Sequence, residues 1–266
     1  MARFKTTIYQ IQLHKPNLTP GSFRAVFLSD LHNVEIGPGN AQLLEAVRAA
    51  EPDLILCGGD MIVGKPGMCT EPASEFLKRL SEIGTVYFAP GNHEYRTQIY
   101  PETYPGMYEQ FRTSLADADL IWLENSHIRR QIRGLSVCLY GLMIDRIYYA
   151  RFKHSQLPLN EMRSMLGSPD PDAVNLVLAH NPAHMKTYLE WGGDLTLCGH
   201  YHGGMVRFGK HRGLLCPDLR PFSAKAYGHH ERKGRHVVIG AGLGEHTVPI
   251  RIRNPRELVV LDISIL

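Results

Sequence analysis

Long hydrophobic runs are absent from this chain of 266 residues. No stretch reaches the roughly 20 consecutive apolar residues that a membrane-spanning helix requires. The amino-terminal segment, residues 1–18, carries basic residues but lacks the continuous apolar stretch of a secretory signal. We therefore expect a cytoplasmic protein with no transmembrane segment, and peripheral contact with a membrane stays open.

Cysteine is scarce and its spacing is uninformative. The count is odd and no CxxC pair occurs, which argues against a complete disulfide framework and against a zinc knuckle. Cys57 and Cys198 fall within apolar runs, where a free thiol packs as a small hydrophobic group. A reducing compartment is the simplest interpretation. The five cysteines are Cys57, Cys69, Cys138, Cys198 and Cys216.

An excess of charge of either sign is also missing. The net charge is only +3, too weak to predict a stable nucleic-acid complex. Hydrophobic residues make up 44% and charged residues 21%, as in ordinary globular proteins. No linker stands out, so we expect residues 1–266 to form a single domain. Nothing in the composition bears on the oligomeric state.

Short apolar runs alternate with amphipathic segments in the first half. They predict strands at 23–29, 53–58 and 85–90, with helices at 41–52 and 72–84 between them. This alternation favours parallel pairing, and Asn40 is the expected N-cap of the first helix. Further strands are expected at 7–13, 119–124, 128–144, 175–179, 194–198, 235–243 and 256–266, and a helix at 106–115. Two facing sheets with helices outside fit this mixture.

Five short polar motifs follow five of these predicted strands, at the point where each strand leaves its sheet. Sites in layered α/β and α+β proteins are commonly built from loops at that edge. Asp, His and Asn, the residue types supplied there, are ligands of divalent metals. The motifs are Asp30-Leu31-His32, Gly59-Asp60, Gly91-Asn92-His93-Glu94, His180-Asn181 and Gly199-His200-Tyr201-His202.

Taken singly, each motif has an ordinary structural explanation. A histidine at a strand end is usually a satisfied polar residue. Asp60, which follows two glycines, fits a turn cap. The set is harder to explain in that way, because five separate strand ends carry mutually compatible metal ligands. We therefore predict a metal site at this edge.

In their order and spacing, the motifs D-x-H, G-D, G-N-H-E, H and G-H-x-H resemble the calcineurin-like metallophosphoesterase superfamily. The SDLHN start and the closing GLGEHTVPIRIRNPRELVVLDI are similar to its bacterial phosphodiesterase-like branch. The resemblance covers about residues 20–262. It implies an α+β fold, an α/β/β/α sandwich of two mixed sheets packed face to face and flanked by helices, with a binuclear metal site at the sheet edge.

The resemblance also implies ligand roles. Asp60 would bridge two metal ions, and His93 would lie beside them without binding. The first ion would be held by Asp30, His32 and His202, and the second by Asn92, His180 and His200. The catalytic set would be His93, Asn92 and Asp60. The ligand mixture suits Mn²⁺ best, with Fe or Zn²⁺ as alternatives.

The activity that follows is phosphodiester hydrolysis by in-line attack of a metal-bridging hydroxide, with His93 as a candidate acid for the leaving oxygen. The substrate would be a small phosphate ester or a lipid or nucleotide diester. One alternative is a phosphomonoesterase or diphosphate hydrolase acting on a nucleotide- or lipid-linked substrate. Another is a scaffold that binds metal without turnover.

One position departs from the family pattern, and several signals are softer. Many relatives carry an acid three residues after the bridging Asp, whereas this chain has Val63; Glu94 is one candidate to orient His93 instead. Arg96 and Arg146 are candidate phosphate contacts. Tyrosines in 95–111 and 148–152 fit either core packing or a substrate rim, with packing favoured. The basic stretch 220–236 fits a solvated hairpin better than an anion-binding surface.

Overall fold

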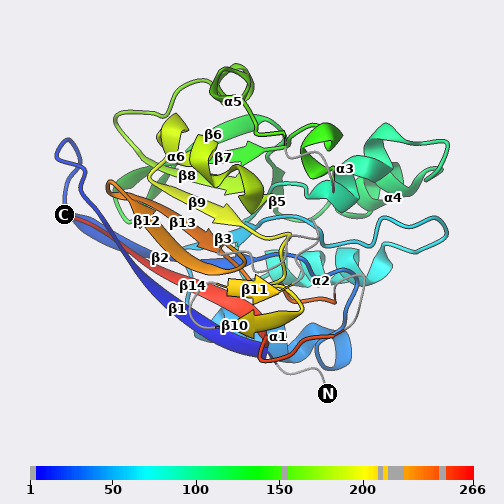
Figure 1. Ribbon diagram of the computed structural model, residues 1–266. Coiled ribbons are helices and arrows are strands. Elements are labelled where there is room, and N and C mark those ends of the chain that lie inside the picture. The colour runs from blue at the N-terminus through cyan, green and yellow to red at the C-terminus, as the bar shows by residue number, and fades with distance from the viewer. Residues whose placement is uncertain (1–3, 151–154, 209–211, 215–224, 246–249) are drawn as a thin grey trace.

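The computed structural model describes residues 4–150, 155–208, 212–214, 225–245 and 250–266. Within these ranges, two six-stranded sheets pack face to face, with helices on both outer faces (Figure 1). Each sheet is mixed, with both parallel and antiparallel neighbours. The predicted α/β/β/α sandwich is therefore confirmed.

The first sheet contains the strands predicted in the first half of the chain. Its neighbours β2, β3, β4 and β5 run parallel, as the alternation of strands and helices predicted, while β14 is antiparallel to β2 and parallel to β1. Its order is β1 (Phe4–Leu13), β14 (Arg256–Ile265), β2 (Gly21–Leu28), β3 (Leu54–Cys57), β4 (Val86–Phe88) and β5 (Leu120–Trp122).

The second sheet has a parallel centre and a hairpin at each edge. Strands β13, β9, β8 and β7 run parallel, and β12 and β6 close the edges by antiparallel pairing. Its order is β12 (Gly228–Arg232), β13 (Arg235–Ile239), β9 (Leu195–Cys198), β8 (Val174–Ala179), β7 (Leu135–Leu142) and β6 (Ser126–Ile132). A small separate pair, β10 (Val206–Phe208) and β11 (Arg212–Leu214), was not predicted.

Helices cover each sheet on the side away from the other sheet. The first sheet packs against α1 (Ala41–Ala49), α2 (Glu71–Ser81) and α4 (Met107–Ser114), and the second against α5 (Leu159–Leu166) and α6 (Met185–Trp191) (Figure 1). The remaining helical elements are α3 (Asn92–Ile99), η1 (Pro38–Asn40), η2 (Arg146–Tyr149) and η3 (Pro182–His184). None of the helices in the described ranges is long and apolar enough to cross a membrane.

Burial on both faces explains why the central strands were easy to recognise. In β2, Phe23, Ala25 and Phe27 face the core between the sheets. Val26 and Leu28 face the helices on the other side. Because successive side chains of a strand point to opposite faces, a strand covered on both sides becomes a continuous apolar run.

One local prediction was wrong, and one helix was missed. Asn40 precedes α1, but its backbone is left-handed and its Oδ1 accepts from the Ile36 N–H at 2.7 Å, so it does not cap the helix. Helix α3 was not predicted, because its sequence, NHEYRTQI, has no apolar periodicity.

The softer prediction of core packing is confirmed for two residues of the first aromatic cluster. Tyr108 and Phe111 are buried, and Phe111 belongs to the core against the first sheet. Residues 228–236 belong to the β12–β13 hairpin, which has an exposed turn at 233–234. Nε2 of His229 lies 2.9 Å from Nδ1 of His236. Phe152 and residues 220–224 lie outside the described residues.

Candidate metal centre

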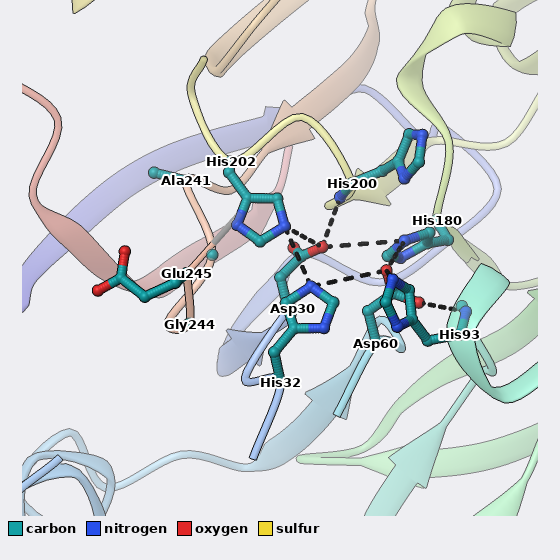
Figure 2. Close-up of polar contacts among 12 residues, drawn as sticks. Asp30, His32, Asp60, His93, His180, His200, His202, Ala241, Gly244 and Glu245 are labelled. Carbon is teal, nitrogen blue, oxygen red and sulfur yellow. Dashed lines mark hydrogen bonds and ion pairs between the residues drawn. The ribbon is translucent and has the colours of Figure 1, made fainter. Parts of the chain in front are cut away.

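The predicted ligand residues converge at one edge of the sandwich. The loops that carry them follow β2, β3 and β4 in the first sheet and β8 and β9 in the second. Figure 2 shows the side chains of Asp30, Asp60 and His180 directed toward one another. Among the described residues, three groups have possible ligand atoms within 4.8 Å of one another: Asp30 with His32 and His202, Asp60 with His180 and His200, and His32 with Asp60 and His93.

The first of these groups brings together the first and the last of the five motifs. Nε2 of His202 lies 3.4 Å from Oδ1 of Asp30 and 3.2 Å from Nε2 of His32. Asp30 is fully buried and His202 is nearly so. The two motifs are therefore adjacent, although 170 residues separate the two histidines.

Asp60 lies between the groups. Its Oδ2 is 3.8 Å from Nε2 of His32 and 3.1 Å from Nε2 of His180. Its Oδ1 is occupied by the backbone N–H of His93, in the first turn of α3, at 2.8 Å. A carboxylate at a helix amino terminus is favoured by the helix dipole. This bond fixes the carboxylate with Oδ2 turned to the centre.

Five of the candidate ligand residues have positive backbone φ angles. Positive φ angles are uncommon outside glycine, although Asp, Asn and His adopt them more readily than other residues. Such local strain is concentrated at functional sites in proteins. The values are 54° for Asp30, 51° for His32, 55° for Asp60, 66° for His200 and 49° for His202.

Two glycines allow the loops to approach closely. A Cβ on Gly91 would lie 2.3 Å from Oδ1 of Asp60, and one on Gly199 would lie 2.4 Å from Oδ2 of Asp30. Real Cβ atoms do not approach other atoms so closely. Any other residue at these positions would displace the carboxylates.

Backbone carbonyls orient two of the histidines. The carbonyl of Gly58 lies 2.7 Å from Nδ1 of His180, and that of Ile62 lies 3.3 Å from Nδ1 of His32. Because a carbonyl only accepts, both Nδ1 atoms carry the proton and donate it. In the neutral rings the Nε2 atoms are then the free acceptors that face the centre, as in metal-ligating histidines, whose other ring nitrogen is held by a hydrogen bond.

The unsatisfied atoms and the charges of the cluster fit a bound cation. Oδ2 of Asp30 and Oδ1 of Asn92 are buried without a hydrogen-bond partner among the described residues. Such atoms are costly to bury unless something binds them. Burial raises the pKa of Asp30. Burial would lower the pKa of His180, but Asp60 and Asp30 together raise it to about 10. The carboxylates of Asp30 and Asp60 therefore stabilise a positive charge at this centre.

A backbone group orients His93. The N–H of Gly64 donates to Nδ1 of His93 at 2.9 Å, so the neutral ring carries its proton on Nε2. That nitrogen lies 3.9 Å from Oδ2 of Asp60. Burial holds the pKa of His93 well below its usual value, although Asp60 opposes this shift. His93 is thus a neutral donor directed at the centre.

Glu94 does not orient His93, contrary to one of our two sequence interpretations. Its carboxylate is fully buried and ties the Asp60 turn to the start of α3. Oε2 accepts from the N–H of Asp60 at 2.8 Å and of Gly91 at 2.9 Å, and Oε1 from that of Met61 at 2.8 Å and of Ile62 at 3.2 Å. This bracing role was invisible in the sequence.

The predicted phosphate contacts and rim residues lie around the same edge. The charge of Arg96 contributes to the lowered pKa of His93. Arg146, an exposed residue of η2, lies over the ring of Tyr100, 4.8 Å from its centroid. The ring of Tyr149 packs edge-on against His200, with centroids 5.2 Å apart. Tyr149 therefore differs from the packing tyrosines and lies beside the candidate ligands.

Sequence reasoning missed the loop after β13. Leu243 N–H donates to the Ser29 carbonyl at 3.1 Å, and the Gly244 N–H donates to the Asp30 carbonyl. Arg251 approaches Nδ1 of His202 at 3.3 Å. The glycine-rich GAGLGE at 240–245 was the available signal for this close approach.

With this geometry in place, known families can be compared. The model of the calcineurin-like phosphoesterase family matches residues 23–204, which contain every predicted ligand. The chain belongs to this family. The resemblance stated from the motifs is thereby confirmed, and membership supports metal-dependent hydrolysis of phosphoric esters.

Individual relatives are distant. A Caenorhabditis elegans protein whose name places it among metallophosphoesterases is 28% identical over 258 residues. That match covers 92% of this chain and 49% of the relative, so the chain spans about half of that relative's length. The Escherichia coli protein named phosphodiesterase YaeI is 23% identical over 269 residues, covering 98% of this chain and 88% of its own.

Solved structures show the same fold at lower identity. The phosphopantetheinyl hydrolase of Mycobacterium tuberculosis superposes with a TM-score of 0.52 at 12% identity, covering 82% of this chain and 89% of the other. At this identity the likeness supports the fold alone.

Proposed function

We propose that this protein is a binuclear metal-dependent phosphodiesterase. The observation that carries the proposal is the convergence of carboxylate, amide and imidazole groups from five strand-end loops around unsatisfied buried atoms of Asp30 and Asn92. Family membership supports phosphoester hydrolysis, and the name of the Escherichia coli relative supports the diester preference.

The proposed ligand assignment follows the two main groups. Asp60 would bridge the two ions, since its Oδ2 lies between His32 and His180. One ion would be held by Asp30, His32 and His202, and the other by Asn92, His180 and His200. This mixture of carboxylate, amide and imidazole suits Mn²⁺, with Fe or Zn²⁺ as alternatives.

Two such cations, when bound, lower the pKa of a water that they share and neutralise charge on phosphate oxygens. The chain's own residues position this chemistry. Asp60 and Asp30 are fixed by backbone donors, the N–H groups of His93 and His200. His93 presents an Nε2 proton that can stabilise a phosphate oxygen or pass to the leaving oxygen.

The charge around the edge is consistent with a diester. A monoester dianion needs additional cationic groups for tight binding, whereas a diester carries a single charge. Arg96 and Arg146 are the candidate cations, and Arg146 is exposed on η2. A phosphomonoesterase or a hydrolase of nucleotide- or lipid-linked diphosphates is the second candidate, and it would require both arginines to face the substrate.

The test compares hydrolysis of bis-p-nitrophenyl phosphate with that of p-nitrophenyl phosphate. The protein is stripped with a chelator, refilled with Mn²⁺, and its metal content counted by mass spectrometry. We expect about two ions per chain and faster turnover of the diester. Faster monoester turnover would favour the second candidate. Two bound ions with neither compound cleaved would contradict activity on simple esters.

A substitution makes the test specific to the bridge. Asp60→Asn removes one negative charge at the centre and should abolish metal-dependent turnover while the protein stays folded. Asp117→Asn, an exposed carboxylate after α4, is the matched control and should leave turnover unchanged. Full activity of Asp60→Asn would reject the two-metal mechanism.

A further inference from the structure

The loop after β13, residues 240–245, packs directly behind Asp30. Its backbone N–H groups at Leu243 and Gly244 donate to the carbonyls of Ser29 and Asp30. Gly242 has a φ of 68°, and a Cβ there would lie 2.8 Å from the Cβ of Asp30. The position of Asp30 therefore depends on this loop, which Figure 2 shows beside His202.

Arg251 ties the loop to His202. Its guanidinium donates to the carbonyls of Ala241, at 2.9 Å, and of Gly244, and reaches Nδ1 of His202 at 3.3 Å. The side chain is only 10% exposed. This contact fixes the orientation of the ring, with Nε2 of His202 turned toward Asp30 and His32.

Asn254 holds the same motif from its backbone side. Its amide nitrogen donates to the carbonyls of His202, at 2.6 Å, and of Gly204. Asn254 is 2% exposed. The carboxylate of Glu257, three residues further along, accepts from the N–H of Ala241 at 3.0 Å. Residues 251–257 therefore brace both the Gly199–Gly204 loop and the loop behind Asp30.

The other candidate ligands are oriented by different groups. His180 is held by the carbonyl of Gly58, and Asp60 by the N–H of His93. These contacts come from loops of the first sheet, at a distance in sequence from residues 251–257. The direct contacts of Arg251 and Asn254 are with the loop of His202 and the loop behind Asp30, although His200 belongs to the same loop as His202.

We propose that Arg251 and Asn254 are positioning residues for one of the two metal ions, the one assigned to Asp30, His32 and His202. The proposal rests on the proposed function, because it presumes a two-ion centre. Both residues lie beyond 204, where the match to the family model ends, so this part of the site is supplied by the carboxyl-terminal segment. Groups that hold metal ligands in place typically change metal affinity 10–100-fold when they are removed.

The experiment titrates Mn²⁺ into the chelator-stripped full chain and measures each binding constant by calorimetry. Arg251→Met and Asn254→Ala should each weaken the site of Asp30, His32 and His202 about 10–100-fold, and weaken it more than the other site. The electron paramagnetic resonance signal of a coupled Mn²⁺ pair should be lost at ion concentrations that give the wild type a full pair. Arg253→Met, an exposed neighbour in the same segment, is the matched control.

Several outcomes would overturn the inference. Wild-type affinity at both sites in Arg251→Met and Asn254→Ala would do so, and so would equal weakening of both sites. If Arg251→Met fails to fold, Arg251→Lys decides, because it keeps the charge but cannot reach all three acceptors; unchanged affinities there reject the proposal. Failure of the wild type to bind two ions would instead reject the proposed function.

Discussion

The backbone N–H of Gly64 donates to Nδ1 of His93 at 2.9 Å. A carboxylate at this place would accept a hydrogen bond from Nδ1–H and stabilise the imidazolium form. A backbone donor has the opposite effect and keeps the ring neutral with its proton on Nε2. The absence of an acid at Val63 therefore leaves His93 oriented, but as a weaker base than in relatives with the acid.

This relationship predicts the behaviour of His93→Ala. We expect kcat to fall about 10²–10⁴-fold with the metal content unchanged, because no ligand is lost. Loss of an ion would show instead that His93 is a ligand. Leaving groups separate its two possible roles. If Nε2 protonates the leaving oxygen, an alkyl diester should lose more than a nitrophenyl diester; equal losses would indicate charge stabilisation alone.

Glu94→Gln should destabilise the protein. The carboxylate satisfies four buried backbone N–H groups, and an amide offers only one accepting oxygen. Leaving buried donors unsatisfied costs about 1–3 kcal/mol each, so we expect a loss of about 2–4 kcal/mol in the free energy of unfolding. Urea denaturation measures it. Glu109→Gln, exposed on α4, should be neutral; equal stability of both variants would contradict the bracing role.

The pair Arg24–Asp262 should make stability depend on pH. The two residues are in register across β2 and β14, and Nε of Arg24 donates to Oδ1 of Asp262 at 2.6 Å. This hydrogen bond lowers the pKa of Asp262, against a smaller opposing effect of burial. A lowered folded-state pKa contributes stability above the unfolded value, about 3.9, and that stability is lost as pH falls through the folded value.

Asp262→Asn tests this contribution. Because Arg24 is 39% and Asp262 26% exposed, solvent screening limits the pair to about 0.2–1 kcal/mol. The difference from wild type in the free energy of unfolding should be constant from about pH 5 to 8 and should shrink below about pH 3.9. Urea curves at pH 7 and pH 3 measure it. A difference that grows on acidification would contradict the assignment.

The parts of the site that could be predicted from the sequence are those with local signals. Asp30 and His200 follow buried strands whose apolar runs are unambiguous, and strand ends on one sheet edge must meet. Glu94 stood within a recognised motif, yet its role depends on the Asp60–Ile62 turn, 32–34 residues earlier, which packs against the start of α3. Arg251 and Asn254 act across the sandwich, and no periodicity or spacing links them to His202.

Helix α3 shows the same limit at the level of secondary structure. The segment 92–99 begins with three polar residues, of which His93 and Glu94 bind other loops, and only Glu94 and Thr97 are buried. Its amino terminus is held by tertiary bonds, among them the one from the His93 N–H to Asp60. Tertiary contacts, rather than an apolar stripe, therefore define this helix, and such contacts leave no pattern in the sequence.

Tyr149 should contribute to substrate binding if the proposed function is right. The backbone carbonyl of Tyr148, the preceding residue, accepts a hydrogen bond from Nδ2 of Asn181 at 3.1 Å and lies 3.3 Å from Nε2 of His184. Because Nδ1 of His184 accepts from a backbone N–H, Nε2 is the donor. These bonds hold η2 so that the Tyr149 ring lies against His200. Burial, with the charge of Asp60, raises the pKa of Tyr149 well above its usual value, so its hydroxyl stays a donor.

The substitutions Tyr149→Phe and Tyr149→Ala separate the hydroxyl from the ring. Loss of one hydrogen bond, about 1 kcal/mol, should lower kcat/KM of Tyr149→Phe about fivefold. Removal of the ring should lower it further, chiefly through KM, with the metal content of both variants unchanged. Tyr148→Phe, whose hydroxyl bonds to Glu161 instead, is the matched control. Wild-type kinetics in Tyr149→Ala would show that the substrate does not reach η2, and would place the binding surface on the side of α3 and Arg96.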